Sequence, residues 1–116
     1  MSVAMSLLFV VTTFPDAETA RRIVRQLVEE ERIACGTLLP GAESLYRWEG
    51  ALETAHECLV LLKTTSEAYP ALEARLKSVH PYEVPEIVAF SASGGLPAYL
   101  EWAARACRPH HEGEAG

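Results

Sequence analysis

Two long strand-forming stretches, joined by a tight turn, constrain the fold of this chain more than any other feature. They cover residues 33–48 and 52–64, and Glu49-Gly50 marks the turn between them. Two strands joined by a short glycine-containing turn are typical of an antiparallel hairpin. Each arm can reach about 15 residues, or roughly 50 Å, whereas a compact domain of this size is only about 35 Å across. We therefore expect the end of the hairpin to project beyond the body of the domain.

The elements on either side of the hairpin predict the topology. An apolar run at residues 5–12 predicts a buried strand, and an amphipathic helix follows, capped by Asp16 and ending near residue 31. Beyond the hairpin, Ser66 is a candidate cap for a second helix, residues 84–90 predict a fourth strand, and Pro97 opens a third helix. The order β-α-β-β-α-β plus a terminal helix predicts an α+β, ferredoxin-like fold. In that fold a split β-α-β antiparallel sheet carries helices on one face.

Length and charge limit the class of protein. A chain of 116 residues suits one domain, which we expect to span residues 1–107. Residues 108–116 lack an apolar pattern and predict a disordered tail. The net charge is −6 and the basic residues do not cluster, which argues against nucleic-acid binding. No run approaches the ~20 apolar residues that a membrane span needs.

The cysteines indicate the compartment. They are Cys35, Cys58 and Cys107, an odd number without C-x-x-C spacing. This pattern argues against a disulfide framework and against a thiolate zinc site. We expect reduced thiols and a cytoplasmic protein.

The far end of the hairpin carries large apolar side chains. Leu45, Tyr46 and Trp48 lie close to its turn, where exposure to water is costly. Either the arm bends back at Pro40-Gly41 and buries them, or another subunit covers them. We favour the second alternative, which predicts self-association.

Several segments, in their order along the chain, are characteristic of one known family. They are Thr13-Phe14-Pro15-Asp16, Ile33-Ala34-Cys35, Leu39-Pro40-Gly41, Ser44-Leu45-Tyr46-Arg47-Trp48-Glu49-Gly50, Lys63-Thr64, His80-Pro81-Tyr82-Glu83-Val84-Pro85-Glu86 and Tyr99-Leu100-Glu101-Trp102. Together they resemble the CutA1 family of divalent-cation-tolerance proteins, over roughly residues 7–104. The resemblance implies a ferredoxin-like homotrimer with interlocked sheets. It also implies a non-enzymatic role in tolerance to divalent metal ions such as copper, with no required cofactor.

The chain departs from this family at the positions to which copper binding is attributed in some bacterial relatives. Those relatives have a cysteine at the end of the first strand and two adjacent histidines before Pro-Tyr. Here the positions hold Thr12 and Val79-His80, and threonine and valine are poor ligands for such a metal. His80 and Glu83 remain as candidate ligands, so we expect Cu²⁺ to bind weakly. A second departure is Gly36-Thr37, where the family usually has Val-Asn.

The loop that contains His80, Tyr82 and Glu83 is the first candidate site. Pro81 and Pro85 stiffen it, so it can hold these side chains in fixed directions toward a metal or small anion. The alternative is that Tyr82 and Glu83 anchor a contact between subunits. The second candidate is a ligand cleft between subunits lined by Tyr46, Trp48 and Trp102. These aromatic side chains are equally typical of an ordinary oligomer interface.

Two further residues carry reactive or charged groups. Cys35 is a candidate thiolate ligand or nucleophile, with a small buried core residue as the alternative. Lys63 ends an otherwise apolar strand, so its charge needs a partner. We expect that partner to be Glu83 or Glu86 across a subunit boundary, and an anion-binding role is the alternative.

Catalytic motifs are missing from the sequence. It has no glycine-rich phosphate loop and no H-x-x-x-H pair, and it contains no asparagine, which an acyl phosphatase would need. We therefore expect a non-enzymatic trimer that affects metal tolerance, with clefts between subunits for a metal or small effector. The alternative is a structural or interaction trimer that docks a protein partner without specific metal binding.

Overall fold

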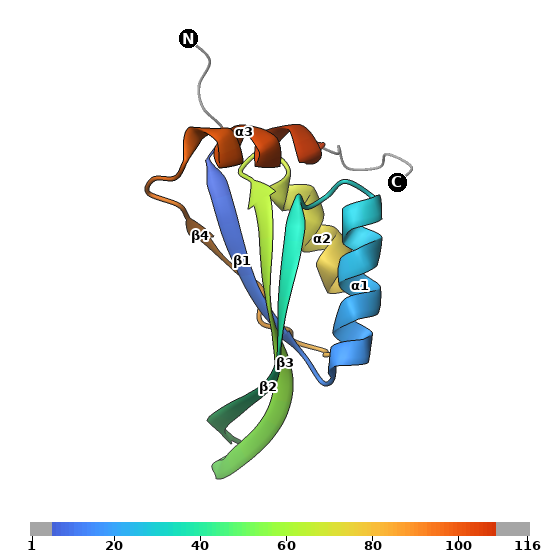
Figure 1. The fold of residues 1–116 in the computed structure, drawn as a ribbon. Coiled ribbons are helices and arrows are strands. Elements are labelled where there is room, and N and C mark those ends of the chain that lie inside the picture. Colours follow the sequence, from blue (N-terminus) through green and yellow to red (C-terminus); the bar gives the residue numbers. More distant parts are fainter. Residues whose placement is uncertain (1–5, 109–116) are drawn as a thin grey trace.

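A computed structural model describes residues 6–108 of the chain (Figure 1). Its elements, in order, are β1 (Leu7–Phe14), α1 (Ala17–Glu29), β2 (Cys35–Trp48), β3 (Ala51–Thr65), α2 (Tyr69–Val79), β4 (Val88–Ser91) and α3 (Pro97–Ala106). The strands form one antiparallel sheet in the order β2-β3-β1-β4. Helices α1 and α2 cover one face of the sheet, and α3 lies across one end (Figure 1). The predicted α+β, ferredoxin-like fold is confirmed.

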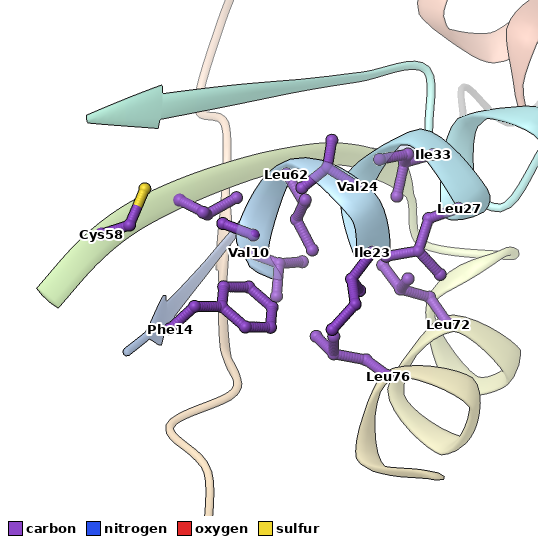
Figure 2. Packing of buried hydrophobic residues seen from close by; sticks show 12 residues of the cluster. Val10, Phe14, Ile23, Val24, Leu27, Ile33, Cys58, Leu62, Leu72 and Leu76 are labelled. Carbon is purple, nitrogen blue, oxygen red and sulfur yellow. The ribbon is translucent and has the colours of Figure 1, made fainter. Parts of the chain in front are cut away.

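The main core lies between the sheet and helices α1 and α2. Successive strand residues point to opposite faces, and the even-numbered residues of β1 and of the inner part of β3 (58–64), such as Val10 and Leu62, are buried on the helical side. Figure 2 shows these residues packed with Ile23 of α1 and with Leu72 and Leu76 of α2. A second cluster, which includes Leu7 and Ala103, holds α3 against the end of the sheet.

The two first helices begin in different ways. The Asp16 carboxylate accepts a 2.7 Å hydrogen bond from the Thr19 N–H, which confirms the predicted cap of α1. The expected cap at Ser66 is wrong. The Thr65 hydroxyl accepts a 3.1 Å hydrogen bond from the Ala68 N–H instead, and α2 begins at Tyr69. Thr65 ends β3, so its side chain fixes the strand-to-helix turn from the strand side.

Several strand boundaries differ from the prediction: β2 and β3 are Cys35–Trp48 and Ala51–Thr65 in place of 33–48 and 52–64, and β1 and β4 also change. The first strand continues to Phe14, because it stays paired with β3 as far as Cys58. The fourth strand begins at Val88, where pairing with Val11 of β1 starts, and not at residue 84. Pro85 has no N–H to donate to a ladder, and Val84 is 83% exposed. Residues 84–87 therefore form an irregular loop that leads into a short edge strand.

The hairpin of β2 and β3 projects from the body, as predicted. The arms contain 14 and 15 residues, and the longest dimension of the molecule is 52 Å. A register shift between Leu39 and Ala42 marks a bulge at Pro40-Gly41, but the arm continues away from the body (Figure 1). Leu45 and Trp48 stay 63% and 60% exposed, so the chain does not bury them itself.

The C-terminal end of the described chain contacts the turn that follows α1. The backbone N–H of Arg108 donates a 2.8 Å hydrogen bond to the carbonyl of Glu31. The rest of the predicted tail, residues 109–116, lies outside the described residues. None of the helices between residues 6 and 108 has the length and apolar character needed to cross a membrane.

Candidate functional site

The imidazole of His80 occupies a buried position directly after α2. Its ring stacks on Phe14 at a centroid distance of 4.5 Å, and the residue is only 8% exposed. Nε2 lies 2.9 Å from the carbonyl oxygen of Thr13 and 3.2 Å from the hydroxyl of Thr12. Nδ1 accepts a 3.1 Å hydrogen bond from the backbone N–H of Tyr82. The ring therefore joins the end of β1 to the loop after α2.

These contacts assign the tautomer of His80. Because Nδ1 accepts a hydrogen bond, the proton of the neutral ring lies on Nε2, which donates to the Thr13 carbonyl. Burial lowers the pKa of His80 below its ordinary value, and the bond to Thr13 opposes this effect. Both nitrogens are thus engaged within the chain, and a metal ion at either one has to displace a hydrogen bond.

Tyr82 connects the same loop to the hairpin. Its hydroxyl donates a 2.7 Å hydrogen bond to Oε2 of Glu57 on β3. Burial and this carboxylate raise the pKa of Tyr82 well above its usual range, so the phenol stays protonated. Sequence reasoning missed Glu57, since nothing in its local pattern links it to a residue 25 positions away.

The carboxylates of Glu83 and Glu86 lie apart from this network. Both residues are exposed, and Glu83 lines a shallow surface hollow with Lys77 and Val84. Among residues 6–108, no three side chains of His, Cys, Asp or Glu come together in a group that could hold a metal ion. The metal-binding role of His80 and Glu83 stays a prediction.

Lys63 and Cys35 are brought together by the sheet. They face each other across β3 and β2, and Nζ of Lys63 lies 3.7 Å from the Cys35 Sγ. The ammonium also donates to the Thr37 hydroxyl and lies 5.6 Å from the centroid of the Phe9 ring. Lys63 is 8% exposed, yet it forms no ion pair within the described residues. Its expected partners, Glu83 and Glu86, do not reach it within one chain.

The sheet face opposite α1 and α2 carries an apolar surface, which we call the open face. It consists of Phe9, Val11, Leu39, Leu59, Leu61, Val88 and Phe90, which share one side of the sheet by strand alternation. Within this surface Phe90 is 57% exposed and Val88 is 44% exposed. Beside it, α3, β1 and β4 enclose a hollow of about 390 Å³ whose lining includes Phe9, Phe90 and Leu100. Sequence reasoning identified neither surface.

The aromatic candidates come from two separate parts of the fold. Tyr46 and Trp48 are close to the turn of the hairpin, whereas Trp102 lies on α3, where its ring centroid is 5.6 Å from that of Tyr99. The hairpin turn and α3 lie at opposite ends of the molecule (Figure 1). One chain therefore cannot form a cleft from all three residues.

Comparison with known proteins identifies the family. The model of the CutA1 divalent ion tolerance protein family matches residues 8–106. The divalent-cation tolerance protein CutA of Thermus thermophilus is 47% identical over 93 residues, which cover 80% of this chain and 90% of that protein. Among solved structures, the Thermus thermophilus protein superposes with a TM-score of 0.85 at 43% identity, covering 88% of this chain and 99% of the other. CutA1 of Oryza sativa gives a TM-score of 0.88 at 36% identity, covering 92% and 98%. With this match along nearly its whole length, the chain belongs to the CutA1 divalent ion tolerance protein family.

Proposed function

We propose that this protein acts as a homotrimer in tolerance to divalent metal ions, with copper as the metal and without catalysis. The names of its relatives support the metal role. The observation that carries the assembly is the unburied apolar surface of a single chain, at the open face and at the hairpin end. Contiguous exposed apolar surface of this kind marks an interaction site.

The position of these surfaces favours a ring. The hairpin end and the open face are different surfaces, so each copy can offer its hairpin end to one neighbour and its open face to another. Such head-to-tail contacts are heterologous and close into a ring where the rotation between copies allows it, and a ring of three matches the homotrimer that the family resemblance implies. In this arrangement Tyr46 and Trp48 of one copy approach the open face and Trp102 of the next. The cleft between them is our candidate site for a metal or small effector.

Light scattering tests the assembly, with an expected mass of three times 12.7 kDa. Replacing Trp48 by alanine should weaken the trimer about 30-fold, because a large buried aromatic residue is a typical interface hot spot. Arg47→Ala changes the neighbouring exposed residue and serves as the control. A monomer at micromolar concentration contradicts the proposal.

The surroundings of His80 favour weak copper binding. Thr12 and His80, two positions to which copper binding is attributed in relatives, are in contact at 3.2 Å, but Thr12 supplies a hydroxyl in place of a thiol. A metal ion also has to displace the partner of a ring nitrogen. We expect a dissociation constant no tighter than roughly micromolar, and weaker binding below about pH 6 as imidazole becomes protonated.

Calorimetric titration with copper, zinc and cadmium tests the metal role. The protein should end at Arg108, since His110 and His111 can bind metal adventitiously. His80→Ala should abolish binding, His56→Ala should preserve it, and Thr12→Cys should strengthen copper binding by adding a thiolate beside the imidazole. Nanomolar affinity of the unmodified protein, or binding that survives His80→Ala, contradicts this ligand choice.

The engagement of both His80 nitrogens also favours a second candidate function, a trimer that docks a protein partner without specific metal binding. A trimer that binds none of the three metals supports this alternative. We place the protein in the cytoplasm, and the free thiols of Cys35, Cys58 and Cys107 suit that reducing compartment.

A further inference from the structure

Lys63 differs from the other buried basic side chains of the described residues. Arg32 is 8% exposed and is paired with the Glu30 carboxylate at 2.8 Å. His80 is equally buried, but it is held as a neutral ring by its two hydrogen bonds. Lys63 is as buried as either and has no carboxylate partner in residues 6–108. Removing an ammonium group from water without an opposite charge is expensive.

The groups around the ammonium satisfy it incompletely. It has three N–H donors. One points to the Thr37 hydroxyl, and the Cys35 sulfur at 3.7 Å is a weak acceptor. The Phe9 ring at 5.6 Å offers only the attraction of its π face. None of these groups is a carboxylate or another anionic oxygen.

The surroundings leave the ammonium reachable from one side. Cys35, Lys63, Phe9 and Phe90 form a row of directly opposed residues across the four strands. Thr37, which accepts from Nζ, is itself exposed on the same side of the sheet. A group that approaches over Thr37 therefore meets the ammonium at the border of the open face.

We propose that Lys63 and Thr37 form a binding site for a carboxylate that comes from outside their own chain. The proposal rests on the proposed function, in which a neighbouring copy covers the open face. An apolar cover alone would remove the remaining water from the ammonium, and the cost of burial would rise. A carboxylate at this point replaces the lost water and fixes the register between copies. It comes either from a glutamate of the neighbouring copy or from a small carboxylic acid held between copies.

A double-mutant cycle tests the first source. Lys63→Met removes the charge and keeps the length of the side chain, and Lys77→Met on exposed α2 is the matched control. Glu83→Gln and Glu86→Gln each remove one of the glutamates expected as partners. If one of these glutamates is the partner, its substitution should raise the dissociation constant of the trimer about tenfold when Lys63 is present. The same substitution should raise it less than twofold in the Lys63→Met background. Lys63→Arg retains the charge and should preserve assembly. Urea unfolding of Lys63→Met shows whether a loss of assembly in that variant follows from misfolding.

Calorimetry with succinate tests the second source. If neither glutamate is coupled to Lys63, succinate should bind the wild-type protein and Lys77→Met, and Lys63→Met should lose this binding. Absence of both glutamate coupling and succinate binding overturns the proposal. It is also overturned if Cys35→Ser abolishes the effect of Lys63, because the Cys35 sulfur would then be the group that satisfies the ammonium. Succinate can be titrated into a monomer as well, so failure of the trimer leaves this site testable.

Discussion

The hydroxyl of Tyr82 donates a 2.7 Å hydrogen bond to the carboxylate of Glu57 and so joins the loop after α2 to the hairpin. Hydrogen bonds to charged groups typically contribute about 1.5–3 kcal/mol. We expect Tyr82→Phe to reduce the free energy of unfolding by about that amount, measured by urea unfolding at fixed protein concentration. Tyr99→Phe is the control, because the Tyr99 hydroxyl has no hydrogen-bond partner within the described residues. Equal stability of the two variants would show that the bond does not hold the loop.

Glu30, directly after α1, joins this end of the helix to α2 and to the loop that leads into β2. Its carboxylate accepts hydrogen bonds from Arg75 of α2, at 3.0 and 2.8 Å, and from Arg32 at 2.8 Å. The Arg75 hydrogen bond is the main cause that lowers the pKa of Glu30 to about 2. We expect Glu30→Gln to cost about 2–3 kcal/mol near neutral pH, as judged from charge-assisted hydrogen bonds.

The pH dependence of this loss follows from the lowered pKa. The folded state holds the carboxylate ionised, so the stabilisation is complete above the ordinary value of 4.5 and disappears as pH falls toward about 2. Urea unfolding at a series of pH values should show the wild-type and Glu30→Gln curves converging in this range. Glu29→Gln, at the adjacent exposed position, should show a small difference throughout. A gap that persists at the acidic end would contradict the assignment.

His80 makes stability depend on pH at a higher range. Burial lowers its pKa below the ordinary 6.5, so the unfolded chain binds a proton more readily than the folded chain. The stabilising contribution is complete above pH 6.5 and is lost as pH falls through the lowered value. The melting temperature of the wild type should therefore fall as pH decreases below 6.5. His80→Gln should remove this decrease in melting temperature. His56→Gln, on the exposed hairpin, should leave it unchanged.

Gly36 lets α1 approach the sheet closely. A Cβ atom at this position would lie 2.5 Å from Cγ1 of Val24 and 3.3 Å from Cδ2 of Leu62. Gly36→Ala should destabilise the fold by about 1–3 kcal/mol, the usual cost of overfilling a packed core. Gly94→Ala is the matched control, because no heavy atom lies within 4 Å of the corresponding Cβ. Comparable urea midpoints for the two variants would show that the core accommodates the methyl group.

Local sequence patterns predicted the elements that have strong periodicity or clear end signals. The hairpin, the Asp16 cap and the order of strands and helices depend on neighbouring residues, and the structure agrees with them. The beginning of β4 was wrong because a four-residue edge strand is defined by its partner β1, which is distant in sequence. The Ser66 cap was wrong because the neighbouring Thr65, still within the strand, is the residue whose hydroxyl reaches Ala68.

The candidate site was predictable only as a set of residue types. His80, Tyr82 and Lys63 were recognisable, but their partners are Thr13, Glu57 and Thr37, which only the folded sheet brings near them. Such contacts join positions 67, 25 and 26 residues apart, and no spacing rule along the chain connects them.

The outer part of the hairpin has a consequence for how the chain exchanges its amide hydrogens. From Ala51 to Glu57, β3 does not pair with β1, so this part of the strand pairs with β2 alone. A ribbon of two strands is marginally stable in water, whereas the four-stranded part opens only with the whole fold. We therefore expect fast exchange in the ribbon of a dilute chain and slow exchange once copies meet. The protein concentration then decides whether this segment holds a fixed shape at all.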